Sequence, residues 1–340
     1  MGLTKLEIEL HNNHNPDRPY VPGDTVSGKV ILIVDSAYKA QALKLKFGGK
    51  EHVHWSEIRY HKYGTGENRR TDRETVYYVG NETLFQNEII LAGNGDDDFT
   101  LPPDRYEYPF RFQLPPQLPA TFSSSFGSIS YQLDVIIKRS WYKANDKASK
   151  ALVVCGIYDL NQNGDASQPG EAIGNKTVCC LCWASGPIVA VIDIPRKGFV
   201  PGDVIPVQVE IQNNSTRDIL EIKLALVQVV VHTAGSHYGK SSRTLNNQVA
   251  TASRDGVQPG QSDTWRGDLL TVPHVQPTTT GKHIIDVWYH LYLEVRIAKA
   301  RNLKLILPVY IGTVPLRRSV PKTASRMTVK ASHKTRASSY

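Results

Sequence analysis

The chain has 340 residues, of which 40% are hydrophobic, with 20 prolines and 25 glycines spread along its length. This length predicts two domains, and short apolar runs separated by turn residues favour strands over long helices. No stretch approaches the roughly 18 apolar residues of a membrane-spanning helix. The first ten residues lack the apolar core of a signal peptide, which predicts a cytoplasmic protein and argues against an extracellular adhesion protein.

The net charge of +8 comes mainly from residues 315–340, which hold seven cations and no carboxylate. The remaining 33 basic and 32 acidic residues nearly cancel, so the body lacks the basic face that nucleic-acid binding requires. The tail is rich in Ser and Thr, and we expect it to be disordered. It is a candidate contact for an anionic membrane, where each cation contributes about 1 kcal/mol and phosphorylation would oppose binding. The candidate contacts are Arg317, Arg318, Lys322, Arg326, Lys330, Lys334 and Arg336.

One phrase occurs twice: YVPGDTVSGKVIL at 20–32 returns as FVPGDVIPVQVEI at 199–211. A repeat at this separation indicates a duplicated domain rather than a solenoid. In each copy Pro and Gly fit the second and third positions of a type II turn. The apolar alternation that follows predicts a half-buried strand in the same phase both times. The repeated turn residues are Pro22, Gly23, Asp24, Pro201, Gly202 and Asp203.

In chain order, residues 1–10 predict a first strand and 42–55 another, followed by an exposed hairpin tip at 62–73. His52, His54 and His61 could supply metal ligands, but no Cys or carboxylate at ligand spacing completes a set, so ordinary strand histidines are the favoured interpretation. Residues 76–79 and 83–93 are expected to be two strands divided by a Gly-Asn turn. Pro109 lies inside a strand pattern and predicts an edge strand.

Residues 159–171 resemble a calcium-binding loop, with Asp159, Asn161, Asn163 and Gly164 at ligand-like spacing. Gly170 stands where the twelfth ligand should be, and Glu171 comes one residue late, so a polar hinge is favoured. The cysteines Cys179, Cys180 and Cys182 lack a fourth zinc ligand at regular spacing, and are interpreted as small apolar filler. With Cys155 they crowd between the halves rather than bracing them, which favours a reducing compartment.

The second half shows the same alternation of apolar and polar residues as the first, which predicts a similar series of strands. Residues 223–234 predict a strand and 237–248 an exposed loop, followed by strands over 263–278, 283–297 and 303–316. The predicted organisation is a first β-sandwich at 1–160, a hinge at 161–186, a second β-sandwich at 187–314 and a disordered tail at 315–340.

The ordered strings LPPDRYEYPFRFQLP, LPATF and GSISYQLDV, and later LPVYIGTVPL, resemble the arrestin-domain-containing proteins, or alpha-arrestins. The resemblance covers about residues 3–316. It implies an all-β chain of two tandem arrestin-type, immunoglobulin-like sandwiches, without a cofactor. It also implies a trafficking adaptor that binds membrane-protein cargo at the plasma membrane or endosomes and supports its ubiquitin-dependent endocytosis or sorting.

Members of that family recruit HECT-type ubiquitin ligases through Pro-Pro-x-Tyr motifs, and none occurs in this sequence. The nearest variant, residues 307–310, is predicted to lie in a core strand, where a WW domain would not reach it. No catalytic motif is evident, so an enzyme is not expected. An arrestin-fold subunit of a retromer-like endosomal sorting complex remains the alternative.

Overall fold

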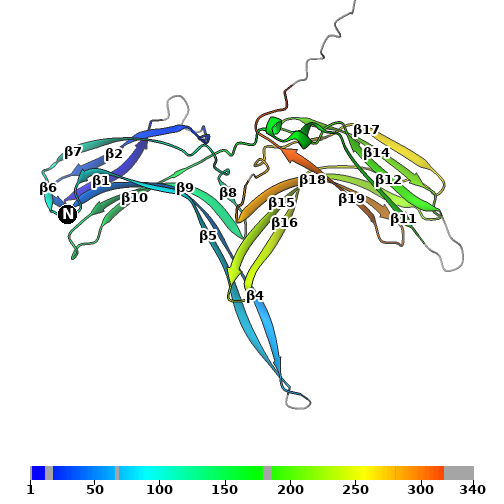
Figure 1. Ribbon diagram of the computed structural model, residues 1–340, viewed down its shortest axis with the longest axis horizontal. Helices are drawn as coiled ribbons and strands as arrows, with labels where there is room; N and C mark the ends of the chain where they lie inside the picture. The colour runs from blue at the N-terminus through cyan, green and yellow to red at the C-terminus, as the bar shows by residue number, and fades with distance from the viewer. Residues whose placement is uncertain (1, 12–17, 66–68, 179–185, 280, 318–340) are drawn as a thin grey trace, which may run out of the picture.

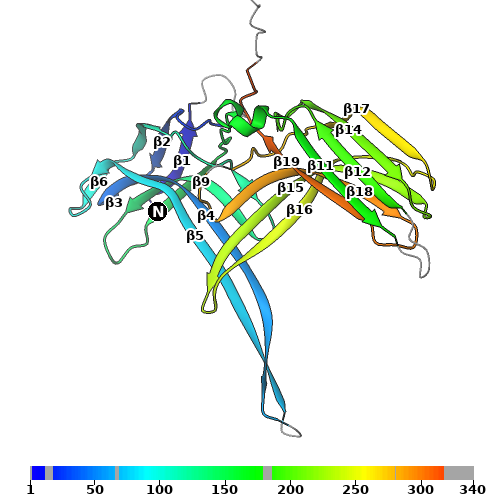
Figure 2. The same ribbon diagram turned by 45° about the vertical axis from the view of Figure 1, so that its right-hand side comes forward.

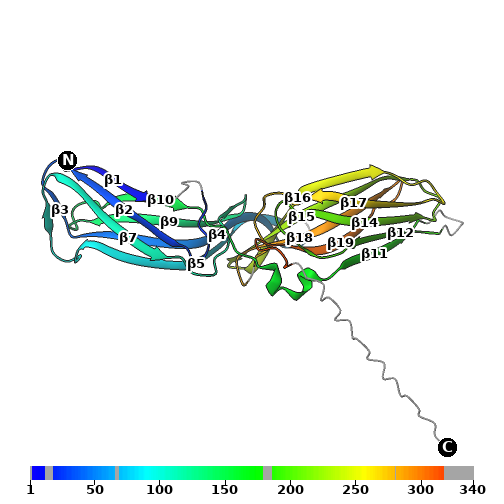
Figure 3. The same cartoon turned by 90° about the horizontal axis from the view of Figure 1, so that it is seen from above.

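The computed structural model describes residues 2–11, 18–65, 69–178, 186–279 and 281–317, and it confirms the all-β fold with two sandwiches in tandem (Figures 1 and 3). The first half contains β1 (Leu3–Leu10), β2 (Thr25–Val34), β3 (Tyr38–Ala40), β4 (Ala42–Tyr63), β5 (Arg70–Gly93), β6 (Phe99–Leu101), β7 (Asp104–Gln113), β8 (Phe122–Ser123), β9 (Gly127–Lys138) and β10 (Asp146–Leu152).

The second half begins with two 3-10 turns, η2 (Leu160–Gln162) and η3 (Gly164–Ser167). Its strands are β11 (Gly170–Thr177), β12 (Pro187–Ile194), β13 (Gly198–Phe199), β14 (Val204–Asn213), β15 (Ile219–Ser236), β16 (Gly239–Asp255), β17 (Ser262–Thr271), β18 (Ile285–Ile297) and β19 (Leu303–Ile311).

The two halves share one topology, as the repeat predicts. In the first, the sheet β1-β2-β7 packs on β10-β9-β4-β5; in the second, β12-β14-β17 packs on β19-β18-β15-β16, and β11 is added at an edge. One pair of residues, Val79 and Gly235, joins β5 to β15, so that the two larger sheets run into each other. Pro109 lies in β7, the last strand in the order β1-β2-β7, and its predicted edge position is therefore confirmed.

The repeated turns are equivalent in detail. Gly23 and Gly202 have φ values of 88° and 91°, the positive values that a type II turn needs at its third position. The carboxylates of Asp24 and Asp203 each accept the backbone N–H three residues back, at 2.8 and 3.1 Å. Each turn thereby holds the start of β2 or β14, whose alternate residues enter the core.

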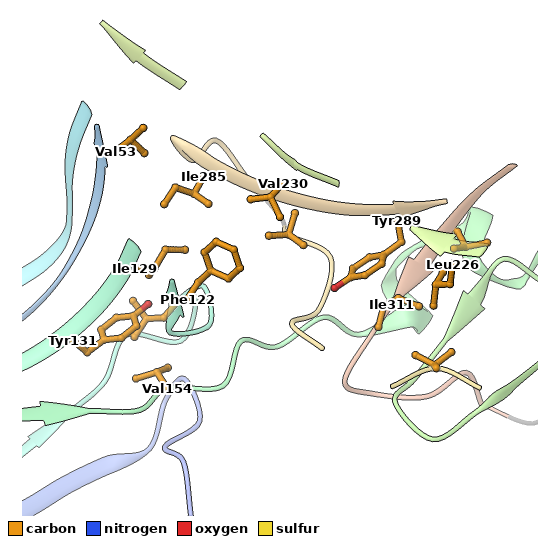
Figure 4. Close-up of a cluster of buried hydrophobic side chains, with 14 of the residues drawn as sticks. Val53, Phe122, Ile129, Tyr131, Val154, Leu226, Val230, Ile285, Tyr289 and Ile311 are labelled. Carbon is orange, nitrogen blue, oxygen red and sulfur yellow. The ribbon is translucent and has the colours of Figure 1, made fainter. Parts of the chain in front are cut away.

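A single apolar core continues across the boundary between the halves. Phe122 and Ile129 of the first half lie beside Val230 and Ile285 of the second (Figure 4). All four side chains are buried. Because this boundary is packed like a domain interior, the halves are joined by a continuous hydrophobic contact.

Two predictions from polar residues were wrong. The stretch 239–248, expected to be an exposed loop, is the first part of β16, which pairs with β15 along its length. The predicted Gly-Asn turn does not exist either, because β5 runs unbroken through Gly80 and Asn81. At Gly80 the second half approaches closely: a Cβ there would lie 3.0 Å from the Thr233 carbonyl oxygen. The glycine therefore permits a close backbone approach instead of a turn.

The hinge expected at 161–186 also needs correction. Residues 170–177 are β11, paired throughout with β12 of the second half. Before it, Tyr158 stacks on Tyr310 at 6.4 Å and bonds to Thr313. On the other side Val154 still pairs with Tyr20 of the first half. Tyr158 and Leu160 already pack with Val200 and Tyr310 of the second sandwich. The covalent link between the halves is therefore residues 155–157.

Candidate functional site

The most prominent feature outside the sandwiches is a long ribbon formed by residues 50–63 of β4 and 70–83 of β5. It continues the first half's large sheet and projects from between the two lobes (Figures 1 and 2). Pairing is regular from Lys50 with Thr83 to Tyr63 with Arg70. Because side chains alternate along strands, the ribbon has two distinct faces.

The inner face of the ribbon contacts the β15–β16 hairpin of the second half. The Tyr238 hydroxyl donates to Glu74 Oε2 at 2.6 Å, and the Arg59 guanidinium lies 4.2 Å from the Tyr238 ring centre. His61 Nε2 is 2.7 Å from the same carboxylate oxygen. Farther back, Arg243 pairs with Glu57 at 2.8 Å. These contacts hold the ribbon against the second half.

Glu74 is the central acceptor of this contact. Hydrogen bonds from Tyr238 and His61 lower the pKa of Glu74, because they stabilise its charged form. His237 Nε2 lies 3.0 Å from its other oxygen. Glu74 is therefore ionised at neutral pH, and two histidines share it.

The opposite, outward face is exposed and partly apolar. Ile58, Tyr60, Tyr77 and Val79 have 47%, 63%, 60% and 42% of their surface accessible. Four large apolar side chains along one ribbon are not needed for the core, which already buries the alternate residues such as Trp55. Clustered exposure of this kind is typical of a binding surface.

The charges of the ribbon are sorted between its faces. The carboxylates all lie on the inner face, at Glu51, Glu57, Asp72, Glu74 and Glu82. The outward positions carry only neutral or basic groups, namely Lys50, His52, His54, Ser56, Ile58, Tyr60, Lys62, Thr71, Arg73, Thr75, Tyr77, Val79, Asn81 and Thr83. This outward face therefore presents aromatic groups and cations to any ligand.

The three histidines considered as metal ligands are separated. His52 bonds to Asn81 at 2.8 Å on the outward face, with His54 two residues along, whereas His61 points inward to Glu74. Within the described residues, no group of three His, Cys, Asp or Glu side chains could hold a metal ion.

The calcium-like loop has a structural role. Asp159 and Asn163 accept backbone N–H groups of residues 161 and 165 and so cap η2 and η3. Gly170 and Glu171 belong to β11. Of the tail, Arg317 is exposed, and its N–H donates to Asn161 Oδ1 at 2.7 Å. The other tail candidates lie outside the described residues, as do Cys179, Cys180 and Cys182; Cys155 is exposed.

Sequence reasoning placed the hairpin tip at 62–73, whereas the strands leave only residues 64–69 between them, and it missed the outward face. The signal was available in the alternation itself, since Ile58, Tyr60 and Lys62 share one phase and Glu57, Arg59 and His61 the other. Tyr238 could not be found in this way, because its partner lies 164 residues earlier in the chain. Also within the described part of the chain, no helix is long and apolar enough to cross a membrane.

Comparison with known proteins places these features in a family. Residues 6–161 match the arrestin (or S-antigen) N-terminal domain, and residues 184–316 match the C-terminal domain. Arrestin domain-containing protein 4 of Mus musculus is 30% identical over 297 residues, covering 87% of this chain and 69% of the relative. Its Homo sapiens counterpart is 32% identical over 302 residues, covering 87% and 68%.

A more distant relative gives the same result over more of the chain. Arrestin domain-containing protein 17 of Caenorhabditis elegans is 27% identical over 319 residues, which cover 92% of this chain and 71% of the relative. Two matched domains in order, the shared topology of the halves and relatives of this kind lead to one conclusion. The chain belongs to the arrestin family, among its arrestin-domain-containing members, the alpha-arrestins.

Proposed function

We propose that the chain is a non-catalytic trafficking adaptor that binds cytoplasmic segments of membrane-protein cargo along the outward face of its ribbon. Membership of the arrestin family supports an adaptor role. The observation that carries the proposal is the sorting of charge: the outward face holds Lys50, Lys62 and Arg73 and no carboxylate. A cationic surface selects acidic partners and speeds their association.

The exposed apolar groups define the rest of the ligand. Tyr60 and Tyr77 lie on the same face as the cations. Tyrosines are favoured at binding hot spots, because they contribute a large contact area with few rotatable bonds. The favoured ligand is therefore an acidic segment that also carries apolar side chains. A segment with either property alone would leave half of the surface unmatched.

The adaptor would support ubiquitin-dependent endocytosis or sorting from a cytoplasmic position at the plasma membrane or endosomes. Its Pro-Val-Tyr segment does not offer a WW-domain site, since Leu307 and Val309 are buried in β19 and Pro308 is paired with His290. In this proposal a HECT-type ligase is not recruited through that segment.

Proximity labelling in cells tests the proposal. The variant Lys62→Glu/Arg73→Glu should lose labelling of membrane proteins at least about tenfold, the change expected when a 1.4 kcal/mol contribution to binding is lost. The control is Arg301→Glu, an exposed charge reversal in the turn before β19. Unchanged labelling in the ribbon variant would contradict the proposal. Recovery of one stoichiometric partner in place of varied cargo would favour the retromer-like alternative.

A further inference from the structure

The loop between β9 and β10, residues 139–145, carries the most exposed large apolar side chain in the described part of the chain. We call it the distal loop, because it lies at the end of the first half that is farthest from the second (Figure 1). Trp141 has 95% of its surface accessible and Tyr142 has 63%. Their rings meet edge to face at 5.8 Å. An exposed Trp-Tyr pair leaves a large apolar area in water that burial elsewhere would recover.

The distal loop is nevertheless held in place at its base. The Arg139 N–H donates to Asn145 Oδ1 at 3.0 Å, and the Lys143 N–H donates to the Ser140 carbonyl at 2.8 Å. The Ser140 hydroxyl donates to the Asp98 carboxylate at 3.0 Å. These bonds close the loop and fix its apex before any ligand arrives. A fixed loop loses less conformational entropy on binding than a flexible one.

A second set of contacts fixes the start of the loop. The Arg139 guanidinium lies 4.6 Å from the centre of the Tyr38 ring and 3.4 Å from Asp146 Oδ2. The Tyr38 hydroxyl bonds to the same Asp146 carboxylate. Burial and this hydrogen bond raise the pKa of Tyr38. The aromatic apex therefore stands on a polar base that keeps its orientation.

We propose that the distal loop inserts Trp141 and Tyr142 into the interface of a phospholipid bilayer. Trp and Tyr favour that boundary, where an apolar ring meets hydrocarbon and a polar group stays hydrated. Lys143, exposed beside them with its ammonium 5.7 Å from the Tyr142 ring centre, can reach lipid phosphates because long basic side chains snorkel.

The size of the loop favours a bilayer over a protein. A stable protein interface buries about 800 Å² on each partner and has an apolar centre from which water is excluded. The apex of this loop offers only two apolar side chains. Of the carboxylates near the loop, Asp146 is paired with Arg139, whereas Asp97 and Asp98 accept from the neutral groups of Asn94 and Ser140 and keep their charge. Lys143 can contact a lipid phosphate beside the aromatic pair, and the apolar area of that pair provides most of the expected binding.

The position of the loop also agrees with the proposed cargo site. The β9–β10 loop and the ribbon lie on the same side of the molecule, as both views show (Figures 1 and 2). Residues 316–317 leave the fold on the other side (Figure 1). Contact between the distal loop and a membrane would therefore bring the ribbon toward the surface from which cargo segments emerge. This orientation rests on the proposed function, but the lipid contact does not.

Sedimentation with vesicles of phosphatidylcholine and a minor fraction of phosphatidylserine tests the lipid contact in the full chain without cargo. The variant Trp141→Ala/Tyr142→Ala should lower the partition coefficient about tenfold, because most of the apolar area that the loop can bury is removed. The matched control is Tyr60→Ala/Tyr77→Ala on the ribbon, which should partition normally. If the control fails to bind cargo but still binds vesicles, the two proposals are separated.

Fluorescence provides the second readout. Lipids brominated in their acyl chains should quench the wild-type protein, and Trp141→Phe, which preserves the aromatic shape, should abolish that quenching. Equal partition of the double alanine variant, or quenching that persists in Trp141→Phe, would overturn the proposal. Binding lost only when residues 317–340 are removed would also overturn it.

Discussion

Glu51 and His283 form a close pair across the boundary between the two halves: Glu51 Oε1 lies 2.8 Å from His283 Nδ1. Glu51 is fully buried, and its other oxygen accepts the Ile284 N–H at 2.9 Å. The carboxylate keeps both contacts only while the second half stays in place, because His283 and Ile284 both lie beyond the boundary. The pair therefore makes the relative placement of the halves specific.

Replacing His283 by Ala should lower the stability of the protein by about 2–3 kcal/mol, since it leaves a buried carboxylate oxygen without its partner. Thermal unfolding measures the effect. The double variant Glu51→Gln/His283→Ala should recover part of the loss, because it removes the charge as well. A single variant that melts with the wild type would show that Glu51 is hydrated in solution.

Acidification should destabilise the protein through His232. This residue is fully buried, and its Nε2 lies 2.7 Å from the Ser124 hydroxyl of the first half. Burial lowers its pKa from the ordinary 6.5. As the pH falls, His232 is therefore protonated in the unfolded chain at a higher pH than in the folded protein. The stability that neutral His232 contributes is fully present above pH 6.5 and is lost as the pH falls through the folded pKa.

The measurement is the melting temperature between pH 7.5 and 5, a range chosen to span about one unit or more on each side of the ordinary histidine pKa. His232→Gln should give a flatter profile. His290, whose pKa burial also lowers, should retain part of the slope. Asp286 has the opposite effect, because burial raises its pKa and its protonation therefore favours the native state. Its ordinary pKa is 3.8, so this effect belongs to lower pH than that of the histidines. An unchanged slope in His232→Gln would contradict the prediction.

Gly80→Val should loosen the contact between β5 and β15. A Cβ at Gly80 would already lie 3.0 Å from the Thr233 carbonyl oxygen and 3.3 Å from Ile284 Cδ1. The two γ-methyl groups of valine need more room than this. Overpacking of this kind typically costs about 1–3 kcal/mol. Limited proteolysis of the 155–157 link should become faster. Gly235→Val is the matched control, because Gly235 lies in β15 at the same contact, has no positive φ, and has no atom within 4 Å of its Cβ position.

The two repeated turns should respond alike to substitution. Gly23→Ala and Gly202→Ala each place a Cβ at positive φ where no neighbouring atom lies within 4 Å. The cost is then backbone strain alone, about 1–2 kcal/mol for each. Melting temperatures of the single and double variants test this, and additive losses are expected because the sites are far apart. A loss confined to one turn would show that the halves do not unfold as equivalents.

The elements predicted well are those in which apolar residues alternate. β2 and β14 were predicted in the correct phase, and the edge position of Pro109 followed from its missing N–H. β16 was missed because Leu245 and Val249 are separated by the polar run NNQ, which in a sheet with one wet face is an ordinary strand sequence. Gly80 was misread because a glycine can mark a turn or a close approach, and only the fold distinguishes the two.

The hinge was misplaced for a related reason. Residues 170–177 read as a polar linker, yet in the edge strand β11 only Gly170 is buried, and alternate positions after it are half-buried. The outward-facing residues of β4 and of β5 can each be predicted from alternation. The register that pairs the two strands cannot be predicted in this way. Contacts such as Tyr238 with Glu74 depend on how two sandwiches meet, which local patterns do not encode.

The shortness of the 155–157 link has a consequence for how the molecule could be divided. The shared apolar core, the Glu51–His283 pair and the ribbon contacts all cross between the halves without using the covalent connection. Two separately translated fragments, divided after Gly156, should consequently reassemble into a working complex. A split reporter with one part fused to each new end would detect the association.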